Sequence, residues 1–174
     1  MVFEAFCRRL TPRVFWLGVA GYGVLMMLAA VLFFQGFLGL EPCPLCVLQR
    51  VYVLVLIPLA LLAAWHDPGP AGQRAWAVAA LLPALAGVAT AARHVWLQSL
   101  PPEQLPACGP GLDVLMEMFG LLGGLRAVLS GSGECGEVAW SFLGLSLAAW
   151  TLVAFLVLSL ALLAFLVRPP ARRA

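Results

Sequence analysis

Residues 14–34 read VFWLGVAGYGVLMMLAAVLFF and include no charged side chain. A helix needs about 20 mainly apolar residues to cross the hydrocarbon core of a bilayer, so this segment predicts a membrane-spanning helix. Three further segments share its character. We expect four spans and two loops on one side of the membrane: spans at about 14–34, 45–65, 75–93 and 142–167, and loops at about 35–44 and 94–141. The sequence therefore predicts an all-α fold, a single four-helix transmembrane bundle over residues 1–174.

The overall composition agrees with a membrane environment. Of the 174 residues, 63% are hydrophobic and only 10% are charged, and the mean hydropathy is +1.01. A soluble domain carries about 25% charged residues, so this chain could not cover a water-facing surface. The net charge of +2 also gives no basic face for a nucleic acid.

The arginines orient the bundle. Those before the first span, between the second and third, and after the fourth all fall on one side: Arg8, Arg9, Arg13, Arg74, Arg168, Arg172 and Arg173. The positive-inside rule makes that side cytoplasmic, so both termini are expected inside and both loops outside. The first apolar run exceeds the ~7–15 residues of a signal peptide, so we expect it to remain as an anchor.

The five cysteines separate by compartment under this topology. Cys7 lies in the expected cytoplasmic tail, where a free thiol without a role is the simplest interpretation. Four others lie in the two outer loops, on the oxidising side where disulfides persist: Cys43, Cys46, Cys108 and Cys135. Four cysteines allow three pairings, and the residues alone leave the pairing open.

Cys43 and Cys46 form a C-x-x-C pair immediately before an apolar helix. A thiolate at a helix N-terminus is stabilised by backbone N–H groups and the helix dipole, and Cys46 is the better placed of the two. Arg50 follows at i+4 on the same helical face. An isolated arginine here would extend towards the headgroups. Beside a redox pair, it could stabilise a thiolate and an anionic electron acceptor.

Cys108 and Cys135 are farther apart in the sequence and permit two interpretations. They could form a static staple, or a disulfide that exchanges with the C-x-x-C pair through thiolate attack. Zinc is disfavoured because only one pair is closely spaced and no histidine flanks the other. Between them, residues 112–122 are mostly apolar and predict a short helix in the membrane interface, or one packed on the other loop.

Several ordered motifs resemble the DsbB family, the bacterial disulfide bond formation protein B. The motifs are Pro42–Cys46 with Gln49–Arg50, Arg93–Gln98, Pro106–Pro110, Gly133–Gly136, Trp140–Leu145 and Trp150. The resemblance covers nearly the whole chain. It implies a bundle in the bacterial inner membrane, with a DsbA-like periplasmic thiol oxidase as electron donor and ubiquinone or menaquinone as acceptor.

The resemblance also implies a role for each site residue. The donor thiolate would attack Cys108 and open a Cys108–Cys135 disulfide. Cys135 would then engage Cys43, and Cys46 would be freed as a thiolate facing the quinone, stabilised by Arg50. His94 would contact the quinone or carry protons, because quinone reduction consumes protons and imidazole titrates near neutral pH; alone, it could equally be an interfacial polar residue. Gln49 stands where the family also shows an acidic residue, and it receives no role.

A paralogue and a non-catalytic assembly protein remain as alternatives, and the order of the cysteines disfavours a third family. A paralogue would perform the same chemistry for a dedicated oxidase. The vitamin K epoxide reductase family also couples quinones to cysteine pairs, but its loop cysteines precede the C-x-x-C, whereas here Cys43 and Cys46 come first. A non-catalytic assembly protein with stapled loops would not require Arg50 beside Cys46.

Overall fold

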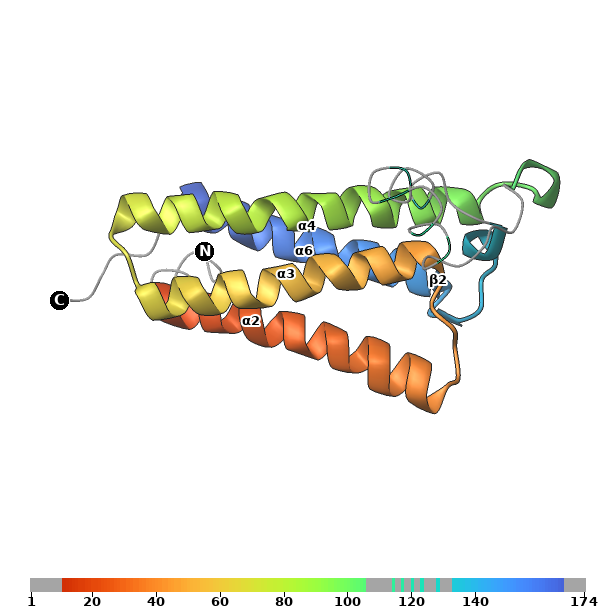
Figure 1. Cartoon of the computed structure of the whole chain (residues 1–174), viewed down its shortest axis with the longest axis horizontal. Coiled ribbons are helices and arrows are strands. Elements are labelled where there is room, and N and C mark those ends of the chain that lie inside the picture. Colours follow the sequence, from red (N-terminus) through yellow and green to blue (C-terminus); the bar gives the residue numbers. More distant parts are fainter. Residues whose placement is uncertain are drawn as a thin grey trace.

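The computed structural model describes residues 11–105 and 133–167, and the single positions 114, 117, 120, 123 and 128. The described elements, in chain order, are α2 (Pro12–Leu28), η1 (Ala29–Phe37), α3 (Pro44–His66), α4 (Pro70–Gln98), η2 (Pro102–Gln104), η3 (Gly133–Gly136), β1 (Ser141–Phe142), β2 (Leu145–Ser146) and α6 (Leu147–Val167). Four of the described helices are long and apolar enough to cross a membrane, with η1 continuing α2. The molecule is a four-helix membrane bundle (Figure 1).

The helix boundaries follow local sequence signals. Proline occupies the first turn of α2, α3 and α4, where its missing N–H costs no hydrogen bond and its fixed φ suits the helix. The C-cap of α3 is Asp67, in the left-handed conformation at φ 35°. The fourth helix begins at Leu147, after the expected start near residue 142. The third extends to Gln98, beyond the expected end near residue 93.

Small residues let the helices pack closely. The core contains large side chains, among them Trp16 and Phe155, and a series of fully buried alanines: Ala60, Ala63, Ala77, Ala80, Ala84 and Ala91. Without a hydrophobic driving force inside a bilayer, such close approach supplies the van der Waals contact that holds helices together. α4 packs most extensively on α6, α2 packs on α3, and α3 on α4.

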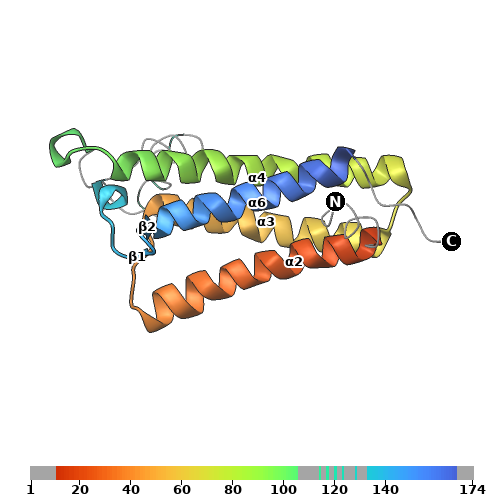
Figure 2. The same cartoon turned by 180° about the vertical axis from the view of Figure 1, so that it is seen from behind.

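α2 and η1 lean away from the other helices at one end of the bundle, the end at which α3 begins (Figures 1 and 2). The opposite end is held closed by a buried hydrogen-bond chain. Trp16 Nε1 donates to Gln73 Oε1 at 2.6 Å, and Gln73 Nε2 donates to Asp67 Oδ1 and to the Pro68 carbonyl. The bundle is therefore tight at the α3–α4 turn and open at the other end.

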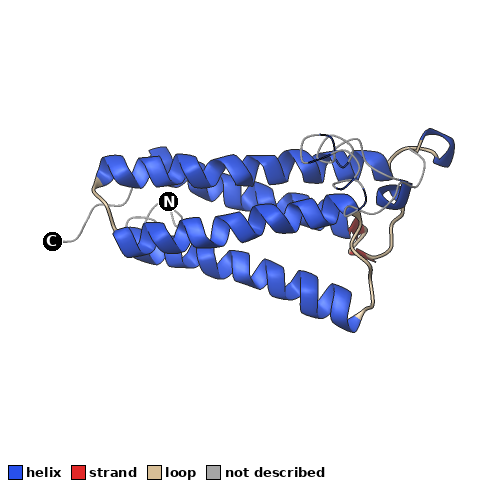
Figure 3. Cartoon of the chain, viewed as in Figure 1, coloured by secondary structure: helices blue, strands red, loops and turns tan. Residues whose placement is uncertain are grey.

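A short antiparallel hairpin precedes α6 at the open end (Figure 3). Its turn residues Leu143 and Gly144 both have positive φ, at 53° and 78°, as the twist of a two-residue hairpin requires. Ser146 then caps α6, its hydroxyl accepting a bond from the Ala149 N–H. The hairpin contacts α6, and Trp140 just before it packs edge-on against Phe34 of η1.

Candidate active site

The C-x-x-C pair occupies the N-terminus of α3. Cys43 is the N-cap residue, with an extended backbone at φ −64° and ψ 162°, and Pro44 is the first helical residue. Cys46 therefore lies in the first turn, as the sequence predicts. The two sulfur atoms are 3.1 Å apart as hydrogen-bonded thiols, against about 2.05 Å in a disulfide. A small movement would join them.

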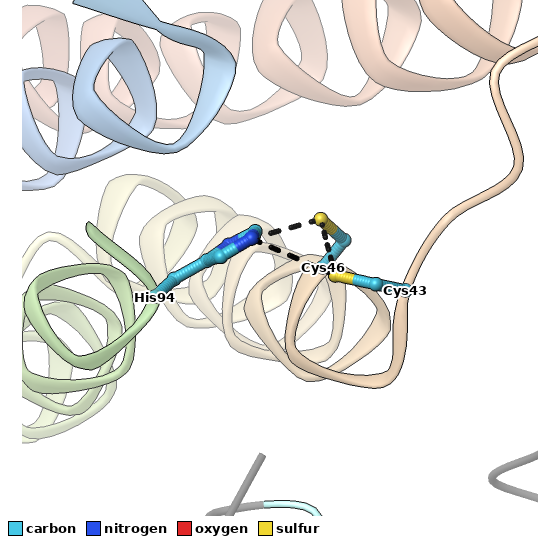
Figure 4. A group of neighbouring side chains, drawn as sticks. All are labelled: Cys43, Cys46 and His94. Atoms are coloured by element: carbon cyan, nitrogen blue, oxygen red, sulfur yellow. Dashed lines mark hydrogen bonds between the residues drawn. The ribbon is translucent and has the colours of Figure 1, made fainter. Parts of the chain in front are cut away.

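His94 projects from α4 towards both sulfur atoms (Figure 4). Its Nε2 lies 3.8 Å from Cys43 Sγ, and its Nδ1 lies 4.0 Å from Cys46 Sγ. The side chain is only 5% exposed, so it is not a surface residue extending towards the headgroups. α3–α4 packing thus gives each sulfur its own imidazole nitrogen, a suitable arrangement for moving protons.

The same three side chains also form a set of potential metal ligands. One ligand atom from each of Cys43, Cys46 and His94 lies within 4.8 Å of the others. The set supplies three ligands from the described residues, because a histidine coordinates one metal ion through only one of its nitrogens. The arrangement therefore suits a dithiol with an adjacent base better than a structural zinc site, which takes four ligands.

Cys135 is brought to this end of the bundle by η3, which packs on α4. It is fully buried, in an apolar cluster with Leu45, Leu97 and Val128, and Cys43 packs against that cluster. Its backbone also neighbours the His94 ring. One loop cysteine thus lies beside the C-x-x-C pair. Cys7, Cys108 and most of the interfacial helix expected at 112–122 lie outside the described residues.

Arg50 reaches across from α3 to the leaning helix. Its Nη1 donates to Gln35 Oε1 at 2.7 Å and its Nη2 to the Ala30 carbonyl at 3.1 Å. Both acceptors belong to η1, whose π-helical geometry is often found at functional sites. The contacts hold the half-buried Arg50 side chain against η1, on the helical face of α3 that carries Cys46.

A cavity of about 490 Å³ opens beside these residues, within the usual range for small-molecule sites. It lies between η1 and the start of α6, and its lining includes Cys43, Cys46, Arg50 and His94. Most of its remaining wall is apolar, contributed by residues such as Met26, Ala30, Val53, Ala154 and Phe155. The cavity can therefore hold an apolar ring against the Cys46 sulfur.

Aromatic side chains from several segments surround the outer part of the cavity. The Trp140 ring meets Phe34 edge-on with centroids 5.0 Å apart and stacks on Phe142 at 6.0 Å. Trp150 Nε1 donates to the Phe142 carbonyl. Gln98 Nε2 donates to the Glu137 carbonyl, and Gln98 Oε1 accepts from Ser146 Oγ. These contacts join α4, the loop and α6 around one space.

From the sequence, none of these aromatic residues is assigned a site role, and neither is Gln49, which also lines the cavity. Aromatic residues near a membrane boundary ordinarily anchor a helix at the interface. Their presence in the sequence therefore does not by itself indicate a binding site. The predicted residues Cys43, Cys46, Cys135, Arg50 and His94 are brought to one end of the bundle.

Comparison with known proteins gives a consistent result. A protein-family model described as "Disulfide bond formation protein DsbB" matches residues 12–165. A protein of Nitrosococcus oceani called Disulfide bond formation protein B is 50% identical over 151 residues, which is 86% of this chain and 88% of the relative. The protein of the same name in Methylococcus capsulatus is 51% identical over 130 residues, which is 75% of this chain and 79% of the relative. The protein of the same name in Stutzerimonas stutzeri is 40% identical over 161 residues, which is 92% of this chain and 98% of the relative.

Proposed function

Because this chain belongs to the DsbB family of membrane disulfide bond formation proteins, we propose that it transfers electrons from a DsbA-like periplasmic dithiol protein to a membrane quinone. Ubiquinone is the expected acceptor, with menaquinone as the alternative. The protein would lie in the bacterial inner membrane, with both termini in the cytoplasm and the Cys43 end of the bundle in the periplasm.

The observation that carries this proposal is the position of Cys46. Cys46 lines a mainly apolar cavity together with the Arg50 guanidinium. Cys43, whose sulfur is 3.1 Å from the Cys46 sulfur, also lines the cavity and packs against the cluster that contains Cys135. The pair thus borders a space for an apolar acceptor and adjoins a loop cysteine. A disulfide staple would have no need of such a cavity.

The donor-side step would use Cys108 and Cys135. The donor thiolate attacks Cys108 and forms a mixed disulfide, and Cys135 leaves as a thiolate. Leu105 lies against Gly136, since a Cβ on that glycine would be 2.6 Å from a Leu105 methyl group. Cys108 follows Leu105 by three residues, a reach of about 11 Å at most. The connection is thus short enough for a Cys108–Cys135 pair.

The next steps return both pairs to disulfides. Cys135 attacks Cys43, and Cys46 leaves as a thiolate facing the cavity, with Arg50 on the same wall. The donor's second thiol resolves its mixed disulfide with Cys108, which releases oxidised donor. Two electrons pass from the cysteines to the quinone, the Cys43–Cys46 and Cys108–Cys135 disulfides re-form, and two protons complete the quinol. His94, close to both sulfurs, is placed to move those protons.

The direct test mixes the purified full-length protein with a reduced thioredoxin-like donor and ubiquinone, and follows the quinone absorbance. Cys46→Ser should abolish quinone reduction and leave membrane insertion intact, because it removes the sulfur that the proposed path directs at the quinone. Cys7→Ala serves as the matched control and should retain full activity. Continued turnover by Cys46→Ser would show that the proposed electron path is wrong.

A further inference from the structure

Gln49 lies on the cavity wall between the two α3 residues that the proposed chemistry uses. It follows Cys46 by three residues and precedes Arg50, so all three share the face of α3 that lines the cavity. The side chain is 5% exposed, and its Nε2 has no hydrogen-bond partner in the described part of the chain. An amide donor is therefore buried beside the cavity, and none of the described residues receives its bond.

Such a group destabilises the folded protein. A buried donor without an acceptor costs about 1–3 kcal/mol, and an apolar residue of similar shape would avoid this cost. Val53, one turn farther along the same wall, shows that apolar side chains fit this face of α3. A buried Gln49 amide therefore needs an interaction that offsets this cost.

Two other glutamines, one buried and one half-buried, have both ends of the side-chain amide bonded. Gln73, 2% exposed, donates to Asp67 and Pro68 and accepts from Trp16. Gln98 donates to Glu137 and accepts from Ser146. The bundle thus satisfies a glutamine amide where the amide serves the fold. The unbonded Nε2 of Gln49 adjoins the cavity instead, and this points to a partner that enters from there.

We propose that Gln49 Nε2 donates a hydrogen bond to a ring carbonyl oxygen of the bound quinone, an assignment that rests on the proposed function. Carboxylates at the cavity edge, such as Glu134 and Glu137, have no N–H to donate. Arg50 already donates two of its N–H groups to η1. Gln49 therefore supplies a neutral donor in addition to that cation.

A neutral donor has a different effect on the reaction from a cation. An N–H bond to a quinone carbonyl can be kept by the hydroxyl oxygen of the quinol, because both oxygens accept hydrogen bonds. Gln49 would therefore stabilise bound quinone and the transition state to a similar extent. Such uniform binding lowers KM and leaves kcat nearly unchanged. Gln49 is thus expected to set quinone affinity rather than the rate of the chemical step.

The test compares Gln49→Met with Gln104→Met in the purified full-length protein. Methionine keeps the length of the side chain and removes the donor, and Gln104 is exposed in η2, away from the cavity. Trp140 and Trp150 line the cavity, so quenching of tryptophan fluorescence by ubiquinone-1 reports binding without turnover. Gln49→Met should weaken ubiquinone-1 binding about five- to tenfold, the loss of one hydrogen bond, whereas Gln104→Met should not weaken it.

Two more measurements separate this role from a structural one. The KM for ubiquinone-1 should rise with its dissociation constant while kcat at saturation is retained. Without quinone, Gln49→Met should unfold at the same or a higher temperature, because a buried unbonded donor has been removed. If Gln49→Met does not accumulate, Gln49→Leu takes its place.

The outcomes distinguish the two levels of the proposal. A wild-type protein that neither binds nor reduces ubiquinone-1 would overturn the proposed function itself. A wild-type protein that does both, beside a Gln49→Met variant with unchanged affinity and KM, would overturn only the assignment of Gln49. In that case solvent in the cavity would be satisfying the amide.

Discussion

At the residue scale, Arg50 combines a structural contact with a position on the cavity wall. The sequence left two interpretations open, an arginine extending to the headgroups or a cation beside the thiolate. In the structure the guanidinium bonds to Gln35 and to the Ala30 carbonyl and also lines the cavity. Arg50 therefore holds the cavity wall formed by η1 in addition to presenting positive charge.

We predict that Arg50→Gln raises the apparent KM for quinone about tenfold or more, because hydrogen bonds from a charged group contribute about 1.5–3 kcal/mol. Steady-state kinetics at varied ubiquinone concentration would measure the change. Arg74→Gln is the matched control, since Arg74 is exposed near the start of α4, at the other end of the bundle. Loss of folded protein with an unchanged KM in the folded fraction would support a purely structural role.

At the element scale, contact between α4 and α6 positions one wall of the cavity. Gly87 of α4 faces the fully buried Phe155 of α6 so closely that a Cβ would lie 2.3 Å from the Phe155 ring. Phe155 also lines the cavity. The position of α6, and with it one wall of the cavity, therefore depends on the absence of a side chain at residue 87.

Gly87→Ala should consequently destabilise the bundle by about 1–3 kcal/mol, as over-packed cores generally do, and should raise the quinone KM by moving Phe155. Thermal unfolding in detergent and quinone titration would measure both effects. The matched control is Gly21→Ala in α2, where a Cβ meets nothing within 4 Å. Equal unfolding temperatures for the two variants would contradict this account of the α4–α6 contact.

At the scale of the whole molecule, the acidic and basic residues are unevenly distributed between the two ends of the bundle. Arg13 and Arg74 lie at the closed end, whereas Glu41, Glu103, Glu134 and Glu137 lie at the end with the cysteines. Ala71, the second residue of α4, adjoins the α3–α4 turn at the closed end. A single orientation in the membrane would thus expose all the redox chemistry to one compartment.

This orientation can be tested by labelling. In a variant with its native cysteines changed to serine, a membrane-impermeant maleimide should label Glu103→Cys on intact spheroplasts. It should label Ala71→Cys only after permeabilisation, because the α3–α4 turn faces the cytoplasm in our proposal. Labelling of Ala71→Cys on intact spheroplasts would reverse the proposed topology.

The sequence by itself determined the four-helix membrane bundle and the helix that carries the C-x-x-C pair. Both depend on local properties: the length of the uncharged segments, the placement of arginines, and proline at the first turn of a helix. The family resemblance, confirmed by the match over residues 12–165, added the type of chemistry. The α3 positions of Cys46 and Arg50 could likewise be inferred from helical periodicity alone.

Only the tertiary structure decided which distant residues meet at the cysteines. His94 reaches both sulfurs because α3 packs on α4, and Arg50 bonds to η1 because the leaning helix brings Ala30 and Gln35 within reach. The cavity lies at the end of the bundle where η1 leans away from the other helices (Figures 1 and 2). Hydropathy and spacing describe each helix singly. The burial of Gln49, and the absence of a partner for its Nε2 among the described residues, depend instead on how the side chains of several helices fill the space between them.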